Sequence, residues 1–168
     1  FAPHRSEYLG LRIYGIDGQM LTLPRSKAII RAGYSGRAIS QYRDTHYPRG
    51  FFTHCYDVLS GVTRDFVFGP KLNEQADATH ILKRLESNSL VIYDRLYFCL
   101  KLVRAHYQRG SYFLFRCRRN ANKLIDDFFQ STDRTQTIQL GEGNYVVHLI
   151  RVPHPETGEQ SVFATNLD

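Results

Sequence analysis

The chain has 168 residues, of which 42% are hydrophobic and 23% charged, a composition typical of one globular domain with a substantial core. No apolar run approaches the roughly 18 residues of a membrane-spanning helix, and the first residues lack the pattern of a signal peptide, so we expect neither. The net charge of +6 favours a polyanionic partner. Because the chain opens on Phe1, we expect either a processed product or a piece of a longer protein.

The basic side chains are concentrated in two stretches that contain almost no acids. Residues 95–123 hold eight lysines and arginines and no acid, and residues 25–49 hold six against the single acid Asp44. Such runs commonly form a solvated face whose counter-charges come from elsewhere in the fold. A nucleic-acid interface is the other interpretation, and composition leaves both open.

The first predicted element is a strand over residues 12–23, interrupted by Asp17-Gly18. An Asp-Gly pair between apolar residues is the strongest short signal for a hairpin turn. Alternatively, the pair ends a strand and presents the Asp17 carboxylate at its tip. We predict a long surface loop over residues 26–47, followed by a hairpin of residues 50–59 and 62–68 around Ser60-Gly61.

The next segments predict a strand–helix–strand unit. A helix capped by Asn73 carries apolar residues at i, i+3, i+4 and i+7, namely Ala78, Ile81, Leu82 and Leu85. A buried strand over 90–93 follows, then a second helical stripe ended by Gly110, then another buried strand over 112–115. The members of that stripe are Leu96, Cys99, Leu100, Val103 and Tyr107. This order predicts a parallel pair with a right-handed crossover, and the upstream hairpin makes the sheet mixed. Residues 137–140, 145–152 and 162–165 then predict a β-meander.

Asp94 is the sharpest candidate for chemistry. It follows the apolar strand over 90–93 at its carboxyl end, where open α/β sheets bind ligands. A carboxylate there suits a hard cation such as magnesium and a phosphate substrate, although Asp is also a common helix cap. If the first strand lies beside this one and parallel to it, Asp17 and Asp94 form half of a two-metal site.

Other catalytic patterns are absent from the sequence. The seven histidines lack metal-ligand spacing, no serine lies in a GxSxG turn, and no glycine-rich loop resembles a P-loop. The three cysteines lack CxxC spacing, so we expect reduced, partly buried thiols in a cytosolic protein.

Four short stretches together resemble a known enzyme family. They are Gly15–Gly18 followed by Leu23-Pro24, Asn73-Glu74, Leu90–Arg95 followed by Tyr97-Phe98, and Ala164–Leu167. Their order and spacing resemble the catalytic domain of bacterial insertion-sequence transposases of the DDE type, in the group that carries a β-strand insertion. Leu96 departs from the glycine usual in that group. The family's third acid lies on a helix expected just after Asp168, so the resemblance implies a partial catalytic domain.

The family resemblance implies a ribonuclease H-like α/β fold, a mixed sheet with flanking helices. We expect one partial catalytic domain over 1–168, with a core at about 10–120 and a β-rich insertion at about 121–168. Asp17 and Asp94 are the implied catalytic and metal-binding residues, holding two Mg²⁺ ions, with Mn²⁺ as a possible substitute. The implied reaction is nicking of DNA at transposon ends, followed by strand transfer.

The implied partner is double-stranded DNA, both transposon ends and target. The residues expected to contact its phosphates are Arg95, Lys101, Arg116, Arg118, Arg119 and Lys123. Arg104 and Arg109 are equally compatible with a solvated face. The resemblance further implies an N-terminal DNA-binding region, a homodimer in the full-length synaptic complex, and a place at the nucleoid in the bacterial cytoplasm. A non-catalytic DNA-binding relative and a nuclease of the same fold are the alternatives.

Overall fold

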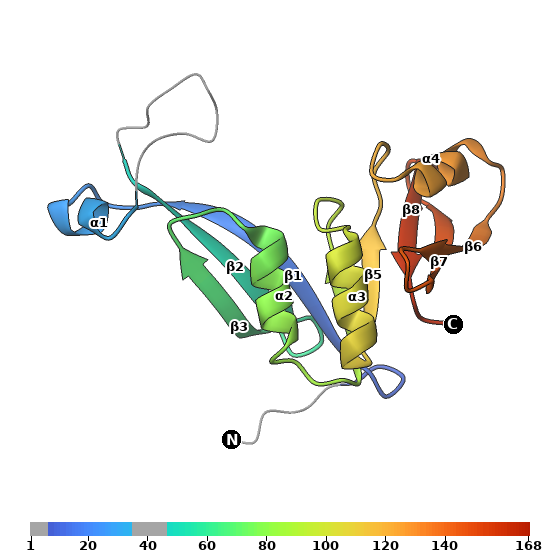
Figure 1. Ribbon diagram of the computed structural model, residues 1–168, viewed down its shortest axis with the longest axis horizontal. Helices are drawn as coiled ribbons and strands as arrows, with labels where there is room; N and C mark the ends of the chain where they lie inside the picture. The colour runs from blue at the N-terminus through green and yellow to red at the C-terminus, as the bar shows by residue number, and fades with distance from the viewer. Residues whose placement is uncertain (1–6, 35–46) are drawn as a thin grey trace.

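A computed structural model describes residues 7–34 and 47–168, and the strands of this part of the chain form one eight-stranded sheet (Figure 1). The strands are β1 (Arg12–Thr22), β2 (Arg49–Asp57), β3 (Val62–Gly69), β4 (Ser89–Tyr93), β5 (Tyr112–Arg116), β6 (Thr135–Leu140), β7 (Tyr145–Pro153) and β8 (Gln160–Thr165). The helices are α1 (Lys27–Arg31), α2 (Glu74–Leu82), α3 (Leu100–Arg109) and α4 (Lys123–Gln130).

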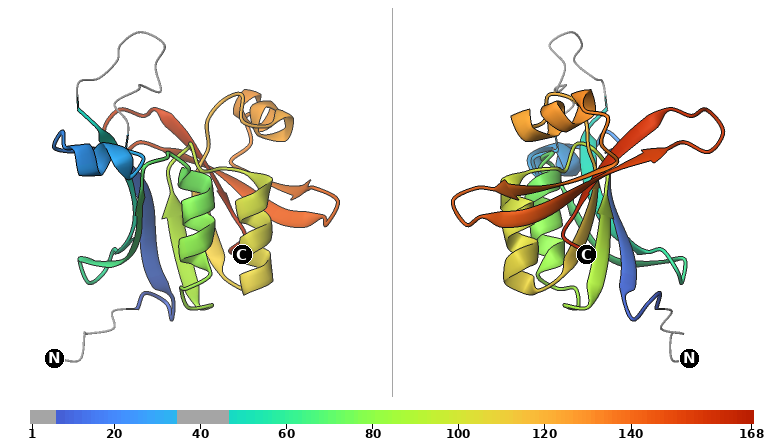
Figure 2. Two further views of the ribbon diagram at one scale, coloured as in Figure 1. Left: turned by 60° about the vertical axis from the view of Figure 1, so that its left-hand side comes forward. Right: turned by 90° about the vertical axis from the view of Figure 1, so that its right-hand side faces the viewer.

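The sheet has the order β3-β2-β1-β4-β5-β8-β7-β6. β1 pairs parallel with β4, and β4 parallel with β5, whereas all other neighbours pair antiparallel. Helices α2 and α3 pack against each other on one face of the sheet, and β6–β8 turn away from the direction of β1 and β4 (Figure 2). This mixed sheet with flanking helices confirms the expected ribonuclease H-like α/β fold.

A row of residues paired across neighbouring strands contributes core side chains from the middle of the sheet. Ile16 lies between Cys55 of β2 and Tyr93 of β4, and the row continues through Phe115 and Ala164. All five side chains are buried on the face covered by α2 and α3. Because side chains alternate along a strand, the next residue of each strand points to the opposite face.

The uninterrupted course of β1 excludes a hairpin turn at Asp17-Gly18. Asp17 pairs with His54 and Gly18 with Thr53, so β1 runs on to Thr22 beside β2. The hairpin signal failed because the partner strand comes from residues 49–57, a contact that no local pattern encodes.

Two helices depart from the sequence-based expectations around residues 26–47 and 120–130. The predicted long loop contains α1, where the Ser26 hydroxyl accepts a hydrogen bond from the Ile29 amide; residues 35–46 lie outside the described part. Helix α4 was not predicted; Asn122 caps it by accepting from the Leu124 amide, and Ile125 and Phe128 are its buried residues.

The predicted apolar stripe of the second helix is confirmed only in part. Val103 is buried and Cys99 packs against the core, but Leu96, Leu100 and Tyr107 are exposed. α3 begins at Leu100, so Leu96 lies in the preceding turn, and Leu102 and His106 complete the buried face beside Val103. Asn73 does occupy the cap position of α2, but its side chain makes no capping hydrogen bond.

His106 is a fully buried polar residue in the middle of this packing. Its Nε2 lies 2.9 Å from the Tyr93 hydroxyl, and its Nδ1 lies 2.8 Å from Ser111 Oγ. A neutral imidazole satisfies both contacts with one donor and one acceptor. Burial lowers the pKa of His106 from 6.5 to about 3, so the ring stays neutral in the folded protein.

We predict that the free energy of unfolding falls as pH is lowered from about 6.5 towards 3. In this window the unfolded chain binds a proton on His106 and the folded chain does not, so His106 contributes at most about 1.4 kcal/mol per pH unit. Urea unfolding at several pH values should show a shallower decline in His106→Gln than in the wild type. Identical slopes for the two proteins would contradict this prediction.

Candidate active site

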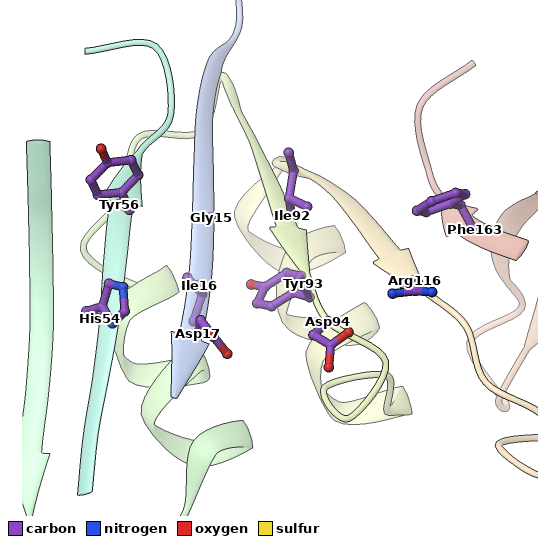
Figure 3. Close-up of a pocket in the computed structure, with 10 residues that line it drawn as sticks. All are labelled: Gly15, Ile16, Asp17, His54, Tyr56, Ile92, Tyr93, Asp94, Arg116 and Phe163. Atoms are coloured by element: carbon purple, nitrogen blue, oxygen red, sulfur yellow. The ribbon is translucent and has the colours of Figure 1, made fainter. Parts of the chain in front are cut away.

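The two predicted carboxylates lie side by side where the parallel pairing of β1 and β4 ends. The β1–β4 pairing ends at Ile16↔Tyr93, so Asp17 and Asp94 are the next residues of the two strands. Tyr93 pairs with Phe115 on β5, so Arg116 follows in the same position on the third strand. Asp17, Asp94 and Arg116 thus succeed one another across neighbouring strand ends, as Figure 3 shows.

These three side chains line one open cleft of about 540 Å³. His54 pairs with Asp17, and Phe163 pairs with Arg116, so the cleft follows the register row His54–Asp17–Asp94–Arg116–Phe163. In Figure 3 the Asp17 side chain points towards the end of β4, where Asp94 lies. Both acids are exposed, and neither forms an ion pair within the described ranges.

The first turn of α2 brings two further acids to this edge of the sheet. The Glu74 carboxyl group lies directly over Gly18, and Asp77 Oδ2 accepts a hydrogen bond of 3.2 Å from the Thr53 hydroxyl. Burial raises the pKa of Glu74, and the charges of Asp17, Asp77 and Asp94 raise it further. Asn73-Glu74 was part of the sequence resemblance, but no role for Glu74 followed from it.

The carboxylates of Asp17 and Asp94 are suitable oxygen ligands for a hard divalent cation, but they do not form a complete site. Exposed carboxylate oxygens without a cationic partner are the ligands that magnesium and manganese prefer. However, among the residues described, no three or more His, Cys, Asp or Glu side chains are grouped closely enough to hold a metal as they stand. Asp17 and Asp94 are thus two candidate ligands, and the described residues do not complete a metal site around them as they stand.

A second cleft, of about 490 Å³, adjoins the first and is strongly basic. Arg116 lines both clefts, and the second is also lined by Arg95, Arg118, Arg119 and Arg151. Four of the six predicted DNA contacts meet here, whereas Lys101 and Lys123 are not among the lining residues.

The comparison with protein families agrees with this geometry. The model of the transposase DDE domain matches residues 9–155, which is most of the chain and includes both acids. The chain belongs to the DDE transposase family. This membership confirms the resemblance drawn from the sequence motifs.

Other comparisons of the transposase domain find only remote likenesses. Two crystal structures of Ciona intestinalis endonuclease V in complex with inosine-containing DNA match with 10% and 8% identity and TM-scores of 0.39 and 0.35. They cover 92% and 90% of this chain, and 70% and 69% of their own. A search of curated proteins finds no significant match. None of the described helices is long and apolar enough to cross a membrane.

Two arginines at the transposase domain's basic surface are held by the fold. Arg151, which sequence reasoning did not single out, stacks on the Phe128 ring at 5.0 Å and donates to the carbonyls of Ser131 and Asp133. Arg119 lies over Phe129, also at 5.0 Å. These contacts fix the positions of guanidinium groups that line the basic cleft.

Arg109 makes a contact within the fold. Its guanidinium donates to the Leu85 carbonyl, just after α2. Arg104 is exposed on α3, and neither Arg104 nor Arg109 lines either cleft. In this they differ from Arg116, Arg118 and Arg119, which line the basic cleft.

Mutual repulsion of the acids predicts a stabilising substitution. Asp94→Asn should raise the free energy of unfolding by up to about 1 kcal/mol at low salt with a chelator present, because it removes one of several neighbouring like charges. The gain should shrink at high salt, where exposed charges are screened. Urea unfolding measures both.

Asp65→Asn is the matched control for this charge effect. Asp65 Oδ2 accepts a 2.6 Å hydrogen bond from Arg84 Nε, and its pKa is lowered because the hydrogen bonds from Arg84 and Phe66 outweigh burial. This variant should therefore lose stability. A loss of stability in Asp94→Asn as well would contradict the repulsion.

Proposed function

We propose that this domain is the catalytic part of a transposase that nicks DNA at transposon ends and transfers the cut strand to a target. The observation that supports this most is the shared position of Arg116. Arg116 belongs both to the cleft of Asp17 and Asp94, which form no ion pair within the described ranges, and to the cleft lined by five arginines, so one phosphate backbone can contact both.

The carboxylates are proposed to hold divalent cations, two Mg²⁺ ions or Mn²⁺ in their place. When bound, such ions lower the barrier to attack on the phosphodiester by activating the nucleophile and stabilising the leaving oxygen. Asp17 is fixed for this role by β1, and its Oδ1 accepts a 2.8 Å hydrogen bond from the Gly18 amide. Asp94 is held by the turn after β4, in which the Tyr97 amide donates to the Asp94 carbonyl.

The arginines are proposed to orient the duplex. Arg116, next to Asp94 in the register row, contacts the phosphate nearest the acids, and Arg95, Arg118 and Arg119 contact the phosphates that follow. Lys101 and Lys123 add to the surrounding positive field, which raises the local concentration of DNA without reading its sequence.

A nuclease of the same fold is the second candidate. It would hydrolyse DNA with the same acids but release the 3′ end instead of joining it to a target. A non-catalytic DNA-binding relative would need only the basic cleft. The paired acids, with no cationic partner in the described part of the chain, favour the two catalytic candidates over the third.

Biological context is proposed on family membership. The domain would act on transposon-end and target DNA as part of a full-length bacterial protein, in a homodimeric synaptic complex at the nucleoid. An insertion sequence is the mobile element such an enzyme would move.

We predict that the double variant Arg118→Ala/Arg119→Ala binds duplex DNA more weakly and with a smaller salt dependence. Each lost phosphate contact should reduce the slope of log K against log salt by about 1. Fluorescence anisotropy over a salt series measures both quantities. Arg104→Ala, an exposed arginine outside both clefts, should leave affinity and slope almost unchanged. If both variants lose DNA affinity equally, DNA binding depends on the overall positive charge of the domain and not on the basic cleft.

We further predict that the 168-residue chain does not cut DNA by itself, because the resemblance places the third catalytic acid after Asp168. The full-length protein should nick and join transposon-end DNA in magnesium, and Asp94→Asn should abolish both steps. Gel assays of nicking and strand transfer separate the candidates. Cleavage without joining by the full-length protein would favour the nuclease, and cleavage by the 168-residue chain would contradict its predicted inactivity.

A further inference from the structure

We propose that Glu74 is a third carboxylate ligand of the divalent-cation site at Asp17 and Asp94. The inference rests on the proposed metal-binding function of those two acids. It adds a ligand from helix α2, on the side of the sheet opposite the cleft.

The closest evidence is the contact between Glu74 and Gly18. A methyl group added at Gly18 would lie 2.2 Å from Glu74 Oε1 and 2.8 Å from Glu74 Cδ. Only glycine therefore allows the carboxyl group of Glu74 to rest against β1 at this point. Gly18 directly follows Asp17, so the two carboxyl groups approach the same short segment of backbone.

The backbone of β1 loses its β4 partner beside Asp17 and Gly18. Asp17 points to the cleft side and Gly18 to the helix side, because side chains alternate along β1. Beyond Ile16, β1 has no paired residue from β4 on this edge, since the pairing stops at Tyr93. Carboxylates from the two faces can therefore reach one point beside this edge. Glu74 has three rotatable side-chain bonds, so its carboxylate can move there without a change of backbone.

The negative charges of Glu74 and the neighbouring acids would be offset by a bound cation. Glu74 is partly buried and interacts unfavourably with Asp17, Asp77 and Asp94, and it forms no ion pair in the described ranges. Several carboxylates in one partly desolvated region are unfavourable unless a positive charge offsets them. A divalent ion with oxygen ligands supplies that charge at the point where they converge.

Tyr97 points independently to a bound ligand. Its side chain is 1% exposed, and its hydroxyl oxygen has no hydrogen-bond partner among the described residues. The hydroxyl interacts electrostatically with all four acids, most strongly with Glu74. A buried hydroxyl that lacks a hydrogen-bond partner destabilises the folded state. A ligand oxygen or a carboxylate drawn towards a cation would give this donor its acceptor.

Asp77 is the natural control because its carboxylate is already engaged. Asp77 lies one turn from Glu74 on α2, but its Oδ2 accepts from the Thr53 hydroxyl. Thr53 is buried and pairs with Gly18, so this hydrogen bond holds Asp77 against β2. The proposal therefore distinguishes two acids of the same helix turn.

Mn²⁺ binding to the chain tests the proposal without any activity measurement. Free Mn²⁺ is measured by electron paramagnetic resonance, and Mg²⁺ binding by calorimetry. Both should show that Glu74→Gln lowers the affinity for the cation by at least about tenfold. Gly18→Ala should give a similar loss, because its methyl group takes the space of the Glu74 carboxyl group next to Asp17 without removing any carboxylate from the chain. Asp77→Asn should bind within about twofold of the wild type.

Each outcome distinguishes this inference from the proposed function. Loss of binding in Asp17→Asn and Asp94→Asn, but wild-type binding in Glu74→Gln and Gly18→Ala, would overturn the role of Glu74 and leave the two-acid site intact. Wild-type binding in all four variants, or none in the wild type, would overturn both. Circular dichroism confirms folding, and if Glu74→Gln does not fold, Gly18→Ala alone decides.

Discussion

The site depends on one feature of strand pairing, the end of the parallel β1–β4 ladder at Ile16↔Tyr93. Up to that pair, both strands are bound by the core under α2 and α3. Immediately after it, β4 stops and β1 continues beside β2 alone. Asp17 lies within β1 and Asp94 directly follows β4, so the strand pairing places the two carboxylates near each other although like charges repel. A fixed pair of repelling carboxylates is what binding of a divalent cation requires.

The stabilising interactions lie away from this edge. At the opposite end of β1 and β4, Glu86 accepts hydrogen bonds from Arg12, Tyr14 and Arg64 at 2.8–3.1 Å. Burial raises the pKa of Glu86, but a backbone hydrogen bond, the Tyr14 hydroxyl and the charges of Arg12 and Arg64 outweigh burial and lower it. Charges are thus paired where the strands begin and left unpaired where they end. The first arrangement holds the sheet together, and the second keeps the acids free for a ligand.

Local sequence could predict Asp94 but not the rest of its site. An apolar run ending in Asp before a helix contains both the strand and its carboxyl end, so Asp94 was placed without any distant contact. Asp17-Gly18 misled because its true partner, β2, lies more than 30 residues later in the chain. Glu74 faces Gly18 only through the packing of α2 on β1, which no spacing encodes. Arg151 was overlooked for the same reason, since β8 places it beside residues 116–119.

The charges change sign along the site, from the two acids on the β1 and β4 side to Arg116 on β5. Asp17, Asp94 and Arg116 occupy neighbouring positions on three adjacent strands, directly after the last β1–β4 and β4–β5 pairs, and adjacent strands lie about 4.8 Å apart. The two acids come first and the arginine follows, with no ion pair between Asp94 and Arg116 within the described ranges. A phosphate group is attracted to the positive charge of Arg116 and repelled by the negative charges of Asp17 and Asp94. In the proposed complex, bound cations would offset the charges of the acids, so the binding of cations and the binding of DNA would favour each other.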